Sequence, residues 1–426
     1  MKSQSVVSIL LTLIISLLLN ACAAPDQAQP AAQGDGVRVT IGFTVSKTGN
    51  LNVESTRQTN GLSLWMKQVN DGGGLKLKDG TVVTFAAKYY DDQSSKGSVQ
   101  QLYTRLATKD NATFLISPYS SGLTDAAAVI AEQYGKIMIT TGAASDSTYE
   151  RGLSLVYQAY TPASRYLTGA VDLLKATDPA AKRIAILHEN DKFSTDVCNA
   201  VRDYAVSHGY EVVFFEGYDT GTTDFAPFIN KMGSSAPDAI LGGGHFQDGS
   251  TFAKQLYEKQ LPVKLVALLV APPESTFAEI GDAAIGIIGP SQWETQESYS
   301  AETAQKVSLP FYGPRSAEFT GSYVAAYGEE PSYHAAGGYA AGLILQNAIQ
   351  TAGSLDPERV KAALDAMNIL TFFGRFQFSV NPESHGLQIG HSMVYIQWQE
   401  DSSGALGKQL VWPAEVGTAE IVYPIR

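Results

Sequence analysis

Residues 114–145, FLISPYSSGLTDAAAVIAEQYGKIMITTGAAS, contain the pattern that decides the fold. Two short apolar runs, Phe114 to Ile116 and Ile137 to Thr140, flank the helix-like run Thr124 to Tyr134. Strand, helix and strand in this order are typical of a parallel sheet whose faces are covered by helices. A polar turn with glycine follows each strand-like run, as expected where the carboxyl end of a strand leads toward a helix.

The same alternation extends through most of the chain. Strand-like and helix-like runs alternate from Val37 to Thr140 and again from Arg183 to Ile288. A body of roughly 390 residues exceeds what one hydrophobic core organises, so two α/β lobes with doubly wound, largely parallel sheets are predicted. The last third has long helix-like stretches followed by strand-like ones, which suits crossovers between lobes: Ser316 to Tyr327, Tyr339 to Ala352, Pro357 to Met367, Phe376 to Val380 and Met393 to Gln399.

The N-terminus has the features of a lipoprotein signal. Lys2 is the one charge before an apolar run, Val6 to Leu19, that is too short to span a membrane. Cys22 follows directly after Ala21, so we expect residues 1–21 to be a signal peptide and Cys22 to carry lipid. The alternative is ordinary secretion with Cys22 incidental. Residues 22–36 are rich in Ala, Pro, Gln and Gly, which predicts a flexible tether.

The composition of the chain argues against some classes of function. The chain has 30 Lys plus Arg against 42 Asp plus Glu, a net charge of −12, which argues against a nucleic-acid partner. Of its two cysteines, Cys198 alone remains once Cys22 is assigned to lipid, so no disulfide within the chain is expected. We expect Cys198, inside a helix-like run, to be a small buried apolar residue and not a nucleophile.

Four polar turns fall at the expected carboxyl ends of strands, where ligands sit in open α/β sheets. Each turn alone is a weak signal, because glycine and serine also fill turns for conformational reasons. The four together predict a binding site: Ser46 to Gly49, Ser117 to Gly122, Thr140 to Ser145 and Gly242 to His245.

In their order along the chain, several segments resemble the leucine/isoleucine/valine-binding branch of the periplasmic binding proteins, the amino-acid and amide group with the type I fold. The resemblance covers nearly the whole chain after the tether, and its motifs are specific jointly, although none is a catalytic signature. These segments are IGFTVSKTG with NGLSLWMKQVNDGGG, YYDDQ, ISPYSSGLTDAAAVIAEQYGKIMITTGAASDSTYERG, RIAILHENDKF, VVFFEGYDTGTTDF, and EPSYHAAGGYAAG with TFFGRFQFS.

The resemblance implies a Venus-flytrap: two Rossmann-like lobes, joined by three crossovers, that close on a ligand. The crossovers are expected near Gln158 to Pro162, Gly289 to Gln292 and Thr371 to Gly374. The first lobe would then comprise residues 37–158 and 290–371, and the second lobe residues 159–289 and 372–426. The family disulfide is not expected, because serines stand at its two positions, 94 and 120.

The resemblance also implies a ligand site. The family's carboxylate cradle falls on Ser121 and on the turn Gly142-Ala143-Ala144, next to Tyr119 and Ser120, with plain turn structure as the alternative. The family's second hydroxyl is missing, because Ala144 stands there with Ser145 next.

Three further ligand contacts are expected outside the cradle. Phe193 would close over the ligand from the second lobe, and His245 falls near another aromatic position, with a surface loop as its alternative. Glu54 aligns with a position that recognises the ligand's side chain, and it is solvated in the alternative reading.

The family's acidic partner for an α-ammonium group is missing around Leu268 to Pro273, and Glu274 comes slightly late. Without it a zwitterion loses a charge-assisted bond of about 1.5–3 kcal/mol. Either Glu54 or Glu274 substitutes, or the ligand is not an α-amino acid. We favour a small carboxylate or amide-type ligand over leucine-like amino acids.

The implied function is that of an extracytoplasmic solute-binding protein, anchored to a membrane only through Cys22, monomeric, and working with the permease subunits of an ABC importer. A ligand-sensing protein with a separate signalling receptor is the alternative. No enzyme activity, catalytic residue, cofactor or metal site is expected, because the six histidines form no close metal pair and no GxSxG, P-loop or GxGxxG motif occurs in a suitable context.

Overall fold

The computed structural model describes residues 36–297 and 299–425. Cys22, the expected signal peptide and all of the expected tether except residue 36 lie outside the described residues. Among the helices of the described ranges, none has the length and apolar character needed to cross a bilayer.

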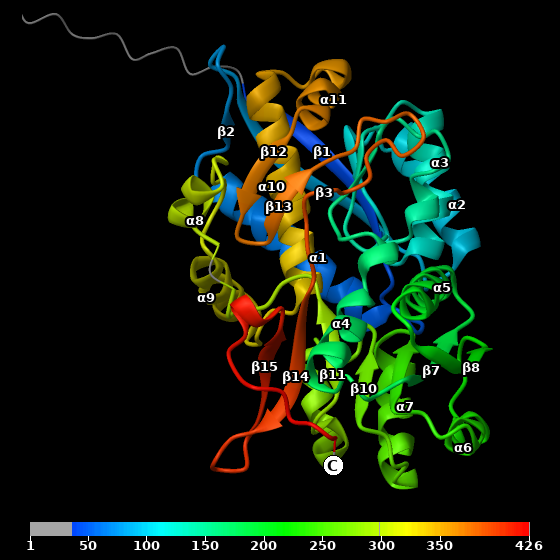
Figure 1. The fold of residues 1–426 in the computed structure, drawn as a ribbon. Helices are drawn as coiled ribbons and strands as arrows, with labels where there is room; N and C mark the ends of the chain where they lie inside the picture. The colour runs from blue at the N-terminus through cyan, green and yellow to red at the C-terminus, as the bar shows by residue number, and fades with distance from the viewer. Residues whose placement is uncertain (1–35, 298, 426) are drawn as a thin grey trace, which may run out of the picture. The chain divides into compact units, whose positions relative to one another are not determined.

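The described chain forms two main sheets and one small hairpin (Figure 1). The first sheet has the order β2-β3-β1-β4-β5-β6, with strands Leu75–Lys76, Val82–Asp91, Gly36–Val45, Phe114–Ile116, Met138–Thr140 and Val156–Gln158. The second has the order β15-β14-β11-β10-β9-β7-β8, with strands Leu406–Trp412, Val394–Glu400, Ile288–Ser291, Leu265–Leu268, Ala239–Gly243, Arg183–Glu189 and Glu211–Tyr218. The hairpin consists of β12 (Asn368–Thr371) and β13 (Gly374–Gln377).

Most strand pairs are parallel, as the alternating sequence pattern predicts. Central strand β1 pairs in parallel with both β3 and β4, whereas β2 is antiparallel at the sheet edge. In the second sheet β14 and β15 are antiparallel additions beyond β11. The prediction of two doubly wound α/β lobes is confirmed.

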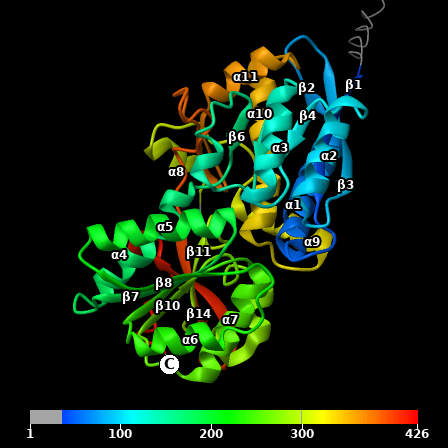
Figure 2. The same ribbon diagram turned by 90° about the vertical axis from the view of Figure 1, so that its right-hand side faces the viewer.

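Helices cover both faces of each sheet, and alternate strand residues serve the two faces (Figure 2). In β7, Ile184 and Ile186 pack in the core with α4 and α5, whereas Ala185 and Leu187 pack in the core with α6 and α7. The helices are α1 Asn52–Asp71, α2 Lys96–Thr108, α3 Ser121–Gln133, α4 Thr168–Thr177, α5 Lys192–Ser207, α6 Ala226–Ser234, α7 Phe246–Lys259, α8 Ala301–Lys306, α9 Ser316–Tyr327, α10 Tyr333–Ala352 and α11 Pro357–Asp365.

Helices α1 and α10 pack together because glycine lets their backbones approach closely. A Cβ on Gly61 of α1 would lie 1.8 Å from the carbonyl oxygen of Ala335, and one on Gly338 of α10 would lie 1.9 Å from that of Gln58. No side chain fits at either position. This close packing brings the first turns of the two helices together, and those turns carry several buried polar side chains described below.

The chain passes between the two lobes after β6, after β11 and after β13. The segment from α9 to β13 packs on the core of the first lobe, through Phe319, Ile344, Leu364 and Phe376 among others. The stretch Thr371 to Gly374, where the third crossover was expected, is the turn of the hairpin β12–β13, and Phe372 and Phe373 belong to that same core. The exact division into lobes remains a prediction.

Candidate functional site

The candidate site lies at the carboxyl ends of strands from both sheets, where a doubly wound fold places its ligands. From the first lobe, Tyr119 follows β4 and Gly142 follows β5. From the second lobe, Asp191 follows β7 and His245 follows β9. These turns meet, because a hydrogen bond of 2.9 Å joins the hydroxyl oxygen of Tyr119 to Nδ1 of His245.

The expected carboxylate cradle is a compact pair of turns in the first lobe. Ser121 begins α3, so its backbone N–H is among the helix donors that lack a partner within the helix. Its hydroxyl oxygen accepts a 3.2 Å hydrogen bond from the backbone N–H of Ser145. The side-chain amide of Gln158 donates to the carbonyls of Ala143 and Ala144 at 3.0 and 3.1 Å and so holds the second turn in place.

Glycine is required at position 142. A Cβ there would lie 2.5 Å from the ring of Tyr119 and 3.0 Å from Oε1 of Gln58. The turn therefore packs directly against the Tyr119 ring. Ser120, the N-cap of α3, is 5% exposed.

Glu54 is fully buried and is not solvated. Its Oε1 accepts a 2.9 Å hydrogen bond from the backbone N–H of Phe246, in the second lobe, and lies 3.8 Å from Nδ1 of His245. Its Oε2 has no hydrogen-bond partner within the described part of the chain. Burial raises the pKa of Glu54, although the charge of His245 opposes that shift.

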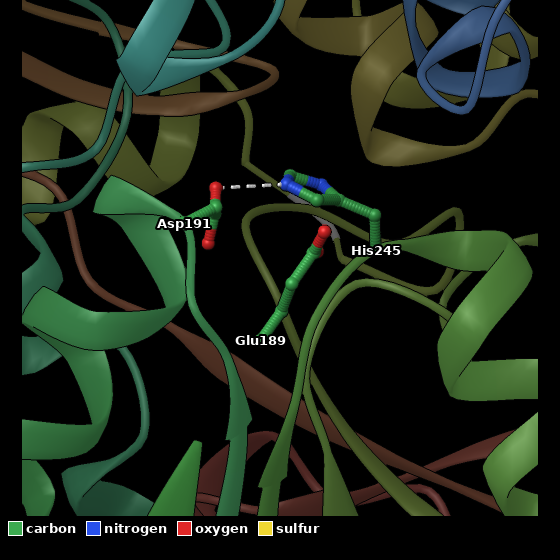
Figure 3. A group of neighbouring side chains, drawn as sticks. All are labelled: Glu189, Asp191 and His245. Carbon is green, nitrogen blue, oxygen red and sulfur yellow. Dashed lines mark hydrogen bonds and ion pairs between the residues drawn. The ribbon is translucent and has the colours of Figure 1, made fainter. Parts of the chain in front are cut away.

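His245 is buried as well and is not in a surface loop. Figure 3 shows its ring beside Asp191 and Glu189, and Nε2 lies 3.1 Å from Oδ2 of Asp191. Burial alone lowers the pKa of this imidazole, but the bond to Asp191 and the carboxylates of Glu189 and Glu54 raise it to about 10. At neutral pH His245 is therefore protonated, and its Nδ1–H donates to the Tyr119 oxygen.

Phe193, which the sequence predicted to close over the ligand from the second lobe, lies in the first turn of α5. Its ring centroid lies 5.8 Å from that of His245 and 5.1 Å from that of Tyr166. It contributes an apolar wall beside the charged imidazole.

Glu274 reaches the same region from the turn after β10. Its Oε1 lies 2.6 Å from Nδ1 of His334, in the first turn of α10, and its Oε2 lies 3.8 Å from Nε of Arg57. The His334 ring stands edge-on to Tyr119, with centroids 5.1 Å apart. Burial acts to raise the pKa of Glu274, but the bond to His334 and its charge outweigh burial and lower it.

Several buried polar atoms around this cluster have no hydrogen-bond partner within residues 36–297 and 299–425. Leaving such an atom unsatisfied costs about 1–3 kcal/mol, and native proteins contain few of them. A polar ligand or water bound among these side chains would satisfy them. They are Glu54 Oε2, Gln58 Oε1, Thr141 Oγ1, Ser145 Oγ, Ser194 Oγ, Glu274 Oε2 and His334 Nε2.

The structure thus gathers the nine expected ligand-binding residues at one place, in two groups. Tyr119, Ser120, Ser121 and the turn 142–144 form the first-lobe wall, and Glu54, Phe193 and His245 surround the contact between the lobes. Ser145 and Thr141 lie in a turn that the sequence predicted to belong to a binding site, but they were not named as ligand contacts, and His334 and Asp191 were not predicted there. The hydroxyl next to Ala144 was the one available signal for Ser145, whereas nothing local indicated that His334 packs beside Tyr119.

The geometry agrees with the outcome of comparison with known proteins. A family model described as periplasmic binding protein matches residues 38–405. The chain belongs to the periplasmic binding protein family. The resemblance drawn from the sequence motifs is confirmed, and it extends over both lobes.

The relatives and solved structures to which the chain is similar include Leu/Ile/Val-type binding proteins. It is 24% identical over 424 residues to Leu/Ile/Val-binding protein homolog 7 of Brucella melitensis, covering 97% of this chain and 99% of the relative. Its fold is similar to that of the branched-chain amino acid transporter substrate binding protein LivJ from Streptococcus pneumoniae, solved with isoleucine, at TM-score 0.70 and 19% identity, covering 88% of this chain and 99% of LivJ. It is also similar to a solute binding protein from R. palustris, solved with 4-hydroxybenzoate, at TM-score 0.73 and 18% identity, covering 88% of this chain and 96% of that protein.

Proposed function

We propose that this protein is the extracytoplasmic solute-binding component of an ABC importer and that it holds a small carboxylate or amide-type ligand between its two lobes. The observation that carries the proposal is the concentration of buried, unpartnered polar atoms from both lobes around the Tyr119–His245 contact. A ligand that touches both lobes favours the closed form by the free energy of those contacts.

The cradle supports a carboxylate or another planar acceptor. Backbone donors at the start of α3 and the hydroxyls of Ser121 and Ser145 offer hydrogen bonds, and the helix dipole favours negative charge there. The ligands named for the solved relatives, isoleucine and 4-hydroxybenzoate, share a carboxylate and differ at the other end.

The acidic side chains support a neutral donor over an ammonium group at the ligand's other end. Glu274 is already compensated by His334 and Arg57. Glu54 already faces the charged imidazole of His245, whose Nδ1 lies 3.8 Å from its Oε1, so an ammonium group would meet a second cation there. We therefore place α-amino acids second.

A thermal-shift panel tests the ligand class on the body from Val37. It includes aliphatic and aromatic carboxylates, short amides, urea and amino acids. Stabilisation should reach about 2.7 kcal/mol when a true ligand is at 100 times its dissociation constant. Carboxylates or amides should raise the melting temperature most. If only branched-chain amino acids do so, the preferred ligand class is wrong.

Anchoring through Cys22 is part of the proposal and rests on the sequence alone. Two acyl chains hold a protein stably on a membrane, so the mature protein should partition into detergent and Cys22→Ser should move it to the aqueous phase. An unchanged distribution of the variant would remove the lipid anchor from the proposal without affecting ligand binding.

Deletion of the gene separates import from sensing. The importer assignment predicts that uptake of the labelled ligand falls. Unchanged uptake with a lost transcriptional or motility response would instead assign the protein to a signalling receptor.

A further inference from the structure

A cluster of metal-ligating side chains lies beside the ligand site, wholly within the second lobe. Glu189 ends β7, Asp191 is the N-cap of α5, and His245 is the N-cap of α7. One ligand atom from each residue lies within 4.8 Å of those of the other two. Figure 3 shows the three side chains converging from neighbouring turns.

The ion pair between His245 and Asp191 does not account for the third side chain of the cluster, the buried carboxylate of Glu189. The residue is 2% exposed, and its Oε2 has no hydrogen-bond partner among the residues that the structure describes. Figure 3 shows its carboxylate pointing toward the ring of His245. A cation would satisfy a buried carboxylate that leaves one oxygen unpartnered within a group that also holds an imidazole and a second carboxylate.

The backbone holds these residues in place independently of any ligand. Oδ1 of Asp191 caps α5 by accepting from the backbone N–H of Ser194 at 2.8 Å, which leaves Oδ2 for the cluster. The backbone N–H of His245 donates to Asp248 at 2.8 Å in a capping box at the start of α7. Ligand side chains positioned by their own secondary structure are preorganised.

The donor set selects the cation. One imidazole and two carboxylates with an open fourth position suit Zn²⁺, whereas Ca²⁺ and Mg²⁺ prefer oxygen ligands throughout. Ligand atoms about 2.0–2.2 Å from Zn²⁺ lie roughly 3.3–3.6 Å apart in a tetrahedral site. The 3.1 Å between His245 Nε2 and Asp191 Oδ2 is close to that spacing, and the Glu189 donor atom, within 4.8 Å of both, completes the set by moving toward them.

We propose that Glu189, Asp191 and His245 form a Zn²⁺ site at the mouth of the cleft. A surface pocket of about 410 Å³, lined by all three residues and by first-lobe residues such as Ser120 and Gly122, gives a cation access. The absence of close histidine pairs had predicted no metal site, but here the ligands come from separate turns, which a search for local motifs does not detect.

The site is connected to lobe closure through the other imidazole nitrogen. A metal-bound histidine uses its second ring N–H to bind an orienting partner, and Nδ1 of His245 lies 2.9 Å from the Tyr119 hydroxyl. Zn²⁺ replaces the proton on Nε2, which is released to solvent, and leaves the Nδ1–H in place. The ring is then fixed in the orientation that makes this contact between the lobes. Zn²⁺ therefore strengthens ligand binding without contacting the ligand cradle.

Untagged protein, treated with chelator and dialysed, is titrated with ZnCl₂ by calorimetry, and Co²⁺ is added separately to record its visible absorption. Wild type should take up one equivalent of Zn²⁺ and give the intense d–d bands of a four-coordinate Co²⁺ site. Glu189→Gln and Asp191→Asn should each weaken Zn²⁺ binding at least tenfold. His208→Gln, a change at a histidine outside the cluster, should leave binding unchanged.

Three results would overturn the proposal: no stoichiometric Zn²⁺ uptake by wild type, equal uptake by Glu189→Gln and wild type, or loss of uptake in His208→Gln. Asp191→Asn also weakens the N-cap of α5 and could fail to fold for that reason. In that case the result for Glu189→Gln alone tests the proposal. The site does not depend on the ligand's identity. If Zn²⁺ does not bind, the ligand proposal is unaffected. If no ligand of the panel stabilises the protein, the Zn²⁺ proposal is unaffected.

Discussion

Nδ1 of His245, in the second lobe, lies 2.9 Å from the hydroxyl oxygen of Tyr119, in the first lobe, and both side chains are buried. Burial raises the pKa of Tyr119 far above its usual range, so the phenol stays neutral. The pKa of about 10 keeps His245 charged at neutral pH. This charge-assisted bond is a direct link between the lobes, worth about 1.5–3 kcal/mol.

Tyr119→Phe should therefore weaken ligand binding by about tenfold or more, since the closed form loses that bond. Calorimetric titration with the best ligand of the panel measures the effect. Tyr103→Phe is the matched control, because the Tyr103 hydroxyl donates to the carbonyl of Ile116 at 2.5 Å within the first lobe. That control should lower stability and leave affinity unchanged. Equal affinities of Tyr119→Phe and wild type would show that the contact does not support closure.

Ser121→Ala and Ser145→Ala should differ in the stability of the ligand-free protein. The Ser121 oxygen accepts from the backbone N–H of Ser145, so removing it leaves a buried donor unsatisfied, at a cost of about 1–3 kcal/mol. The Ser145 hydroxyl has no partner in the described ranges, so its removal should cost nothing. Urea denaturation compares the two variants. Equal destabilisation would mean that Ser145 is a structural residue and not a free donor for ligand.

Glu54→Gln should distinguish ligands with an ammonium group from those without one. Glutamine keeps an acceptor for the backbone N–H of Phe246 but cannot be ionised. Binding of a carboxylate without an ammonium group should change less than threefold, whereas any amino acid that binds should lose tenfold or more. Titration calorimetry with one ligand of each kind is the measurement. A similar loss for both ligands would assign Glu54 to lobe closure and not to ligand selection.

Glu274→Gln provides the comparison for this experiment. It removes the charge that pairs with His334 and Arg57, so it should reduce stability more than Glu54→Gln does. If Glu274→Gln, and not Glu54→Gln, selectively weakens the binding of amino-acid ligands, Glu274 is the partner of the ammonium group.

His391 should make stability depend on pH in the acid range. Burial lowers the pKa of His391 from 6.5 to about 4, although its Nε2–H donates to the carbonyl of Gln292 at 2.9 Å. The unfolded chain therefore takes up the proton first. Above pH 6.5 the ring is neutral in both states, and it does not lower the free energy of unfolding. As the pH falls from 6.5 toward 4, this residue reduces the free energy of unfolding by up to about 3 kcal/mol.

His391→Gln keeps a donor for Gln292 and removes the titrating group. Urea midpoints at several pH values between 4 and 7 should fall less steeply for this variant than for wild type. Parallel slopes would mean that the pKa of His391 is the same in the folded and the unfolded protein.

The sequence predicted the fold well because the alternation of apolar runs is a local property of the chain. The runs around Phe114 and Ile137 become β4 and β5, and the helix-like run between them becomes α3. The first turn of helix α1 is harder to predict, because it is polar and its residues Glu54 and Gln58 are buried through contacts far along the chain.

The first-lobe part of the site was predictable for the same reason, since Ser121 and the turn 142–144 follow strands directly. The contact between the lobes was not. Tyr119 and His245 are 126 residues apart, and His334 and Glu274, which come from different lobes, are 60 residues apart. Whether Glu54 is solvated or buried also depends on the second lobe and not on its neighbours in sequence.

Titration of Ser121→Ala/Ser145→Ala with the strongest ligand of the panel tests most directly whether the cradle binds ligand between the lobes. Circular dichroism establishes that the variant is folded at the temperature used, and Ser250→Ala, which removes another buried hydroxyl without a partner in the described chain, is the control. We predict at least a thirtyfold loss of affinity for the double variant, equivalent to about 2 kcal/mol, and none for the control. An affinity of the double variant within twofold of wild type would contradict the proposed binding site.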